Sequence, residues 1–194
     1  NKMKEIVLKT KGCIVWGGSL NLAPADDKII AVERPLEIDA ESQLLASIMA
    51  KKHSVSSTHI LIDVPTGKDA KVKNKFEAIR LKKEFEKIGK RLKKHIKVLI
   101  TDGKQPIGHG IGPALEARDV LWLLKRDPRR PLDLEKKCLM MCANIFGMVG
   151  LKDGYKKALE ILNSGKAYQK MVEIMQAQGG REIAAEDIQI GRYT

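Results

Sequence analysis

The chain has 194 residues, a net charge of +12 and a hydrophobic fraction of 43%. This length suits one domain or a large part of a multidomain protein, and the hydrophobic fraction is enough for a packed core. No apolar run reaches the roughly 18–20 residues that span a bilayer, and three cysteines without a signal peptide are typical of a reducing compartment. We therefore expect a cytoplasmic protein with no membrane partner.

The first quarter of the chain predicts one strand and one clear helix. The sequence starts at Asn1 within a helix-like pattern, which suggests a fragment or a processed chain. Residues 13–16 predict a short buried strand that ends at Gly17-Gly18, and residues 19–38 are expected to be irregular. A helix should follow from about residue 40 to residue 52, with Asp39 as its N-cap.

The rest of the chain alternates strands with helices and then turns helical. Strands are expected over 59–64 and 96–101, around an amphipathic helix whose inner face would consist of Phe76, Ile79, Phe85, Ile88 and Leu92. Further helices are expected over 113–125, 133–149, 154–163 and 166–178. This order predicts an α/β fold with a mostly parallel sheet and crossover helices. Cys138 and Cys142 lack a nearby His or Cys pair, so they should be buried core residues, and no metal site is expected.

Two loops follow the predicted strands and combine glycine with lysine: PTGKDAK and DGKQPIGHGIGP. Ligands of parallel sheets bind beyond the carboxyl ends of the strands, where glycine lets backbone amides approach an anion. Neither loop matches a nucleotide fingerprint, so plain connections are equally good interpretations. Lys71 lies where the first loop meets a helix. It is either an exposed lysine or, since helix N-termini are positive, a residue that an anion accompanies.

A polar stripe is predicted along the helix over 40–52. Asp39, Gln43, Ser47 and Lys51 are four residues apart, so they share one side of the helix. Each residue alone has an ordinary explanation, such as an N-cap for Asp39 or a charge that suits the helix dipole for Lys51. Together they could face a polar ligand.

Several blocks in the chain resemble the thymidine/pyrimidine-nucleoside phosphorylase family, and most closely its archaeal-type AMP phosphorylases. The blocks are CIVWGGSLNLAPADDKII, IDAESQLLASIMAKK, THILIDVPTGKDAKV and DGKQPIGHGIGPALEARDVLWLL, in the family's order. The resemblance implies a large α/β domain and a small all-α domain. Residues 1–21 would start the α/β domain, residues 22–54 would be an excursion into the helical domain on the base side, and residues 55–194 would continue the α/β domain.

The resemblance also implies roles for particular residues. Asp39 matches the family's proton donor, Ser47 and Lys71 match substrate-binding residues, and Lys51 matches a lysine that faces the base. Arg34 lies near the family's base-gripping arginine but out of register. The family's phosphate-binding segment would lie upstream of this chain, so we expect the 194 residues alone to be inactive.

The implied reaction is phosphorolysis of a nucleoside 5′-monophosphate, with AMP as the leading substrate and CMP or UMP as further ones, to give a free base and ribose 1,5-bisphosphate. No cofactor is expected, because phosphate is the co-substrate. The intact enzyme would be a homo-oligomer, at least a dimer.

Two alternatives stay open. One is a thymidine or pyrimidine-nucleoside phosphorylase. The other is a nucleic-acid-binding α/β module, because residues 68–104 hold 14 Lys or Arg and 5 Asp or Glu, a net charge of +9. Aromatic residues for base stacking are missing among these lysines, so a nucleic-acid partner is not the expected one.

Overall fold

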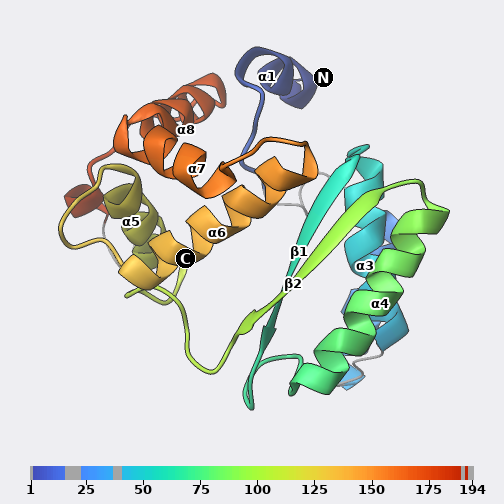
Figure 1. Ribbon diagram of the computed structural model, residues 1–194. Coiled ribbons are helices and arrows are strands. Elements are labelled where there is room, and N and C mark those ends of the chain that lie inside the picture. Colours follow the sequence, from blue (N-terminus) through green and yellow to red (C-terminus); the bar gives the residue numbers. More distant parts are fainter. Residues whose placement is uncertain (1, 16–22, 37–40, 189–190, 192–194) are drawn as a thin grey trace. The chain divides into compact units, whose positions relative to one another are not determined.

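The computed structural model describes residues 2–15, 23–36, 41–188 and 191 (Figure 1). The chain forms two compact units. One comprises residues 1–14 and 106–194, and the other comprises residues 15–105. We call them the helical unit and the sheet unit, and describe each by itself.

The sheet unit is built on a parallel pair of strands. Strand β1 (His59–Thr66) pairs with β2 (His95–Asp102), in a register that aligns His59 with His95 and Thr66 with Asp102. Parallel strands cannot be joined by a hairpin, and helix α4 (Lys75–Arg91) provides the crossover. Helices α3 (Glu41–Ser54) and α4 lie on the same side of the pair (Figure 1). The α/β fold class that the sequence predicts is therefore confirmed.

The core of this unit joins both helices to one face of the strands. Its fully buried members come from α3, β1, β2, α4 and the loop after β1: Leu45, Met49, Ile60, Ile62, Val64, Val72, Ala78, Leu81, Phe85 and Val98. Alternate residues of β1 are buried, as expected for a strand with one covered face. The predicted boundaries of the helical excursion, residues 22–54, stay a prediction.

The inner face predicted for α4 was partly wrong. Phe85 is buried and Ile88 packs against the core, as expected, but Phe76 is 80% exposed, and Ile79 and Leu92 are 39% and 38% exposed. The buried stripe instead runs through Ala78, Leu81 and Phe85, spaced three and four residues apart. The prediction relied on the largest apolar side chains. The real buried stripe includes a small residue, Ala78, and is therefore displaced around the helix axis.

Helix α2 (Pro24–Glu33) lies in the stretch that we expected to be irregular, so that expectation was wrong. A short 3-10 turn (Arg34–Leu36) follows it. The signals of a helix start were present in the sequence. Proline suits the first turn because its missing N–H would be unpaired there, and two acidic residues, Asp26 and Asp27, complement the positive helix end.

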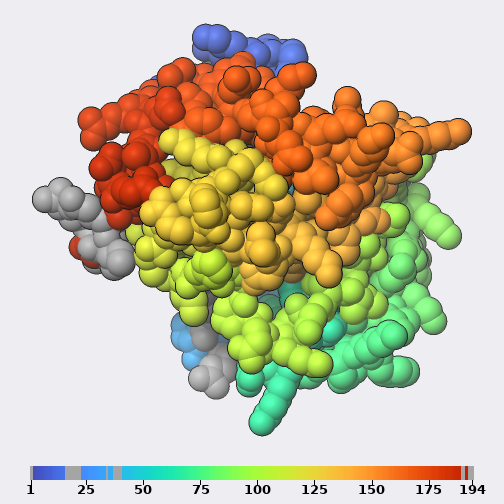
Figure 2. Space-filling view, turned by 60° about the vertical axis from the view of Figure 1, so that its left-hand side comes forward, coloured from blue at the N-terminus to red at the C-terminus, as the bar shows by residue number. Residues whose placement is uncertain are grey.

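The helical unit contains α1 (Lys2–Thr10), α5 (Pro113–Leu124), α6 (Leu132–Met148), α7 (Gly154–Asn163), α8 (Lys166–Ala177) and a short turn at Ala185–Asp187. Its core consists of Leu123, Leu139, Ala158 and Leu162. Helix α1 (blue) packs against α8 (orange to red), and the side chains of the two helices meet at the surface in Figure 2. Among the described residues, no helix has both the length and the apolar character that crossing a bilayer requires.

The predicted buried strand over 13–16 does not form in its described residues, 13–15, and Trp16 lies outside them. Ile14 and Val15 are 50% and 44% exposed. The side-chain amide of Gln178 takes the place of a neighbouring strand. Its Oε1 accepts from the Ile14 N–H and its Nε2 donates to the Ile14 carbonyl, both at 2.7 Å.

Cys138 and Cys142 are likewise exposed, not buried, because α6 turns Leu139 to the core instead.

Glu135 links the turn after α5 to the first turn of α6. Its Oε2 lies 2.6 Å from Arg126 Nη1 and also contacts Arg130 Nε, and the side chain is nearly buried. Burial raises the pKa of the Glu135 carboxyl, but the two arginines outweigh burial, so that its pKa lies below the usual value. A lowered folded-state pKa means that the charge stabilises the fold above the unfolded pKa of about 4.3, and that this stability is lost as the pH falls through the folded-state pKa.

We predict that Glu135→Gln lowers the free energy of unfolding at neutral pH by about 1–3 kcal/mol, because two arginines lose their buried partner. The deficit should shrink in acid, where the wild-type carboxyl is protonated as well. Urea unfolding followed by tryptophan fluorescence, at neutral and acid pH, measures both effects. Glu160→Gln is the control, because its pair with Lys157 is exposed and should contribute little. A deficit that is equal at both pH values would contradict the assignment.

Gly89 lets α4 approach β2 closely. A Cβ at this position would lie 2.7 Å from Ile96 Cγ1 and 2.8 Å from its Cδ1. In an open helix, Gly→Ala stabilises by up to about 1 kcal/mol. Here we predict that Gly89→Ala destabilises the sheet unit by about 1–3 kcal/mol, because overpacking exceeds the propensity gain.

The matched background is Ile96→Ala, which removes the two nearest atoms. Gly89→Ala should be neutral or stabilising in that background, and a thermal-melt double-mutant cycle followed by circular dichroism measures the difference. The same loss in both backgrounds would show that close helix packing is not the reason for this glycine.

Candidate functional site

Helix α3 carries three residues of the predicted polar stripe, and the structure shows what they face. Ser47 and Lys51 both contact Asp26 of α2. The Ser47 hydroxyl donates to Asp26 Oδ2 at 2.8 Å, and Lys51 Nζ lies 3.0 Å from the same oxygen. Gln43 Nε2 donates to the other oxygen, Oδ1, at 3.2 Å. Three members of the predicted polar stripe therefore converge on one carboxylate that the sequence reasoning missed.

Asp26 is 6% exposed, so its partners matter energetically. Burying a carboxylate without hydrogen bonds or a countercharge costs several kcal/mol. Here a hydroxyl, an amide and an ammonium group replace the hydrogen bonds that water would make to the carboxylate. The APADD segment held the available clue, because an aspartate in the first turn of a helix is a common helix-start residue. The sequence alone does not show that the Asp26 side chain points toward α3.

This arrangement fixes what α3 can offer to a ligand. An ionised carboxylate only accepts hydrogen bonds, so the Ser47 proton is directed at Asp26. The Ser47 oxygen can then only accept from a ligand. Lys51 has three donor hydrogens and a half-exposed side chain, so it can donate to a ligand while it stays paired. An acceptor and a cationic donor thus stand one helical turn apart, about 6 Å along the axis.

Asp39 lies outside the described residues. Arg34 opens the turn after α2, and only its backbone is described. The roles expected for these two residues stay predictions. In the described ranges, no three or more His, Cys, Asp or Glu side chains gather in a way that could hold a metal ion.

Lys71 lies on another side of α3, in the loop between β1 and α4. It lines a mainly apolar cavity of about 350 Å³ whose walls include Leu44, Ile48, Ile62, Val72 and Phe85. It also lines a polar cavity of about 270 Å³, where Glu41 and Arg80 form an ion pair. The two cavities share four lining residues: Leu44, Lys71, Val72 and Leu81. The cavities therefore form one groove with an apolar and a polar part.

The structure thus splits the predicted site between two sides of α3. Ser47 and Lys51 face α2, whereas Lys71 lies by Leu44 and Ile48, which face the strands and α4. Both places belong to the sheet unit. The groove has a volume in the range of small-molecule sites, and its one lysine stands where the apolar lining gives way to charged side chains.

The glycines after the two strands serve a close approach of backbones. A Cβ on Gly67 would lie 2.8 Å from the Gly103 carbonyl, and the Gly103 N–H donates to the Thr66 carbonyl at 2.8 Å. A side chain caps the N-terminus of α4. Asn74 Oδ1 accepts from the Glu77 N–H at 3.0 Å, as an N-cap residue does, and Glu77 Oε2 accepts from the Lys73 N–H at 2.8 Å. Lys71 is the lysine of this loop that borders the groove.

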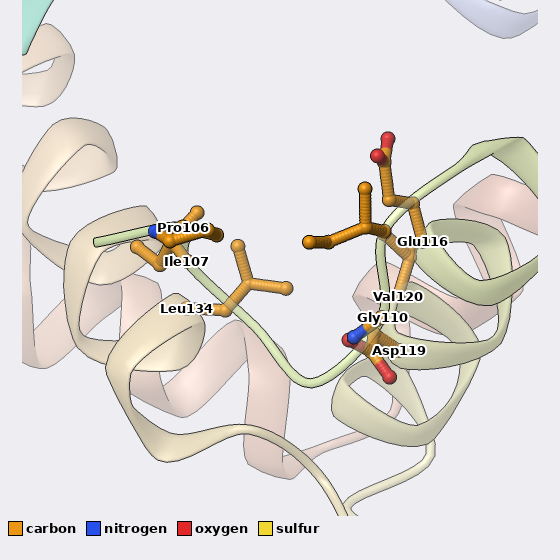
Figure 3. A pocket seen from close by; sticks show the side chains of 8 residues that line it. Pro106, Ile107, Gly110, Glu116, Asp119, Val120 and Leu134 are labelled. Atoms are coloured by element: carbon orange, nitrogen blue, oxygen red, sulfur yellow. The ribbon is translucent and has the colours of Figure 1, made fainter. Parts of the chain in front are cut away.

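The amides of the GHGIGP segment are occupied by the protein's own carboxylates. The N–H groups of His109 and Gly110 donate to Asp119 Oδ2 at 2.7 and 2.9 Å, and the Gly108 N–H donates to Asp133 at 3.1 Å. Figure 3 shows the neighbouring cavity of about 440 Å³, with Leu134 on one side, Val120 and Glu116 on the other, and Asp119 beside Gly110. Its charged lining residues are both acidic, Glu116 and Asp119, so this cavity does not suit a phosphate group.

Comparison with known proteins gives close relatives in sequence. The chain is 48% identical over 181 residues to a protein of Nitrobacter hamburgensis, covering 92% of this chain and 36% of the relative. It is 48% identical over 195 residues to one of Rhodopseudomonas palustris, covering 99% and 37%. It is 44% identical over 197 residues to one of Albidiferax ferrireducens, covering 100% and 38%. Each is named "Putative thymidine phosphorylase". No family model matches the chain.

These similarities support the resemblance to the thymidine/pyrimidine-nucleoside phosphorylase family. The chain spans little more than a third of the length of these relatives, between 36% and 38%. We therefore state the activity of the whole protein to which this chain belongs as a proposal.

We predict that Asp26→Ala lowers the free energy of unfolding by about 1–3 kcal/mol, because Ser47, Gln43 and Lys51 lose their common partner. Asp27→Ala is the matched control, since it removes a neighbouring aspartate that is only partly buried and should cost about 0.5 kcal/mol through the helix dipole. Urea unfolding followed by circular dichroism measures both. Equal losses would mean that Asp26 acts only as a first-turn charge.

Proposed function

We propose that the protein to which this chain belongs is a nucleoside phosphorylase of the thymidine/pyrimidine-nucleoside phosphorylase family, and that it acts on nucleoside 5′-monophosphates, AMP first. The relatives' names support the nucleoside phosphorylase class. The observation that carries the proposal is the pair Ser47 and Lys51, fixed on α3 by the buried Asp26. The pair gives a base-facing helix a defined acceptor and a defined donor.

In the proposed reaction, the bond between C1′ of the ribose and the base nitrogen breaks, while a phosphate oxygen bonds to C1′. The transition state has oxocarbenium character, as in other cleavages of glycosidic bonds. The leaving base carries developing negative charge, and a general acid that protonates it would contribute about 10²–10⁴ in rate. We assign this role to Asp39, on its match to the family's proton donor, and base orientation to Ser47 and Lys51.

We assign recognition of the 5′-phosphate to Lys71, on its match to a substrate-binding lysine of the AMP-type enzymes. It borders both the apolar and the polar part of the groove, and a 5′-phosphate is the group that a nucleotide adds. A lysine within reach of a phosphate supplies a charge-assisted hydrogen bond that no nucleoside can use.

A thymidine or pyrimidine-nucleoside phosphorylase is the second candidate, and the names of the relatives favour it. The out-of-register Arg34 would have to grip the base in that case. Both candidates need phosphate as co-substrate and no cofactor, and for both we propose a homo-oligomer that is at least a dimer.

The test compares AMP, CMP, UMP, adenosine and thymidine as substrates of the intact enzyme, with phosphate present and base release measured. We predict turnover of AMP well above that of thymidine. Lys71→Ala should raise KM for AMP at least tenfold and leave KM for adenosine or thymidine unchanged, because only the nucleotide carries the phosphate. Lys68→Ala, an exposed lysine of the same loop, is the control.

Asp39→Asn should lower kcat by more than about 100-fold with little change in KM, as loss of a general acid requires. An unchanged kcat would reduce Asp39 to a helix cap. Thymidine turnover that exceeds AMP turnover would overturn the nucleotide assignment and leave the pyrimidine-nucleoside candidate. Absence of base release from every substrate would overturn both candidates.

A further inference from the structure

At the amino end of the parallel strand pair, the ends of helices α3 and α4 lie near the starts of strands β1 and β2. Helix α3 ends at Ser54 before β1 starts, and α4 ends at Arg91 before β2 starts. The two connections are tied to each other, because the His95 N–H donates to the Thr58 carbonyl at 2.9 Å. This end of the sheet unit is thus one surface made from two segments, 52–59 and 87–97. We call it the basic end.

The basic end carries positive charge without an acidic residue of its own. Segments 52–59 and 87–97 contain no Asp or Glu, and they hold seven Lys or Arg residues. These are Lys52, Lys87, Lys90, Arg91, Lys93, Lys94 and Lys97. All of them are exposed except Lys94, which is half-buried. Among the described residues, Lys87 pairs with Glu84 at 3.6 Å.

Helix dipoles account for only a part of this charge. Each helix C-terminus carries about half a negative charge, so two helix ends balance roughly one lysine. The excess is a compact positive field on one end of a unit. Such a field raises the local concentration of anions and speeds their association.

A pair of imidazole rings belongs to the basic end. His59 and His95 are aligned in the strand register, and their rings stack with centroids 4.7 Å apart and planes 13° from parallel. Both residues are exposed. The stack is a flat, exposed π surface in the same two segments that carry the lysines. The sequence hides it, because the two histidines are 36 positions apart and meet only through the register.

The backbone conformation at Lys93 fixes the turn that carries part of this charge. Lys93 has a φ of 53°, the left-handed conformation that usually follows a helix and that favours glycine or asparagine. A lysine therefore occupies a place where glycine would cost less. Its N–H donates to the Lys90 carbonyl at 3.2 Å, so that the turn holds a fixed shape.

We propose that the basic end binds single-stranded nucleic acid, independently of the phosphorylase reaction. The lysines would contact the sugar-phosphate backbone, and the exposed face of the His59–His95 stack would receive a base. Cationic grooves with aromatic platforms are how proteins bind single strands without sequence preference. The surface supplies in the folded state the stacking element that is missing among the lysines in the sequence.

The test is a fluorescence-anisotropy titration of the protein with a labelled single-stranded RNA of mixed sequence, at several salt concentrations. We expect log K to fall linearly with log salt, because each neutralised phosphate contributes about −0.7 to the slope for a single strand. The triple variant Lys90→Glu, Arg91→Glu, Lys93→Glu should bind at least tenfold more weakly and with a slope shallower by about 2.

The matched control is Lys152→Glu, Lys156→Glu, Lys166→Glu. It changes the net charge by the same amount on exposed lysines of the helical unit, and it should weaken binding far less. Circular dichroism checks the fold of both. If the glutamate triple does not fold, the glutamine triple at the same three positions replaces it, with half the charge change and the same direction of effect.

The double variant His59→Ala, His95→Ala separates stacking from charge. It should weaken RNA binding about tenfold at unchanged salt slope, since stacking is worth about 1–3 kcal/mol per base. Binding of inorganic polyphosphate, which has no bases, should not change. Equal effects of the two charge triples would overturn the assigned location. Tighter binding to anionic lipid vesicles than to RNA, or no effect of the histidine pair on RNA binding, would overturn the assigned partner.

Discussion

The parallel pairing of β1 with β2 is the constraint on which the sheet unit depends. Two parallel strands point the same way, so the chain must return along its full length between them, and α4 makes this return. The two carboxyl ends then lie at one edge and the two amino ends at the other. The Lys71 loop follows a carboxyl end, and the stacked histidines open the strands at the amino ends. The geometry therefore provides two chemically different places without any further folding step.

Buried carboxylates fix the loops around this frame and within the helical unit. Asp26 holds α2 against α3, Asp119 holds the amides of the GHGIGP segment, and Glu135 holds the turn before α6. Each is less than 10% exposed, and a buried charge accepts few alternative partners at low cost. The consequence for Asp119 is functional. Amides that look free for a phosphate in the sequence are already bonded, so a glycine-rich loop after a strand is not by itself an anion site.

Periodicity and strand grammar were sufficient to predict the α/β class, the two strands and the helices from α3 to α8. These elements repeat apolar residues at regular spacing, and such spacing is local information. The errors share a different cause. Helix α2 is short and its apolar residues are mostly exposed, so it has no strong periodic signal, only start residues. The segment 13–15 has strand-like composition, but Gln178, far along the chain, satisfies its backbone groups. No local pattern contains that partner.

The candidate site divides in the same way. The helical spacing of Gln43, Ser47 and Lys51 was enough to place them on one side of α3, yet not to find Asp26, which their side chains face. Likewise, Lys71 stood out by its loop, but the groove that it borders requires Leu44 from α3 and Leu81 from α4. Residues that act through a partner from another element are the ones that a single sequence conceals.

The direction of the Ser47 proton bears on the choice of substrate. With its hydrogen on Asp26, Ser47 can accept and Lys51 can donate, so in the proposed function α3 would face an edge that has one N–H next to one acceptor. Uracil and thymine present such an edge with a ring N–H beside a carbonyl, and adenine presents one with its amino group beside a ring nitrogen. The α3 pair would therefore suit purines and pyrimidines alike. Discrimination between nucleotides and nucleosides must come from a group that senses the phosphate, and in the sheet unit Lys71 stands at the place where the groove becomes polar. On this argument, substrate class is decided at the 5′ end of the sugar, and the base-facing helix sets orientation.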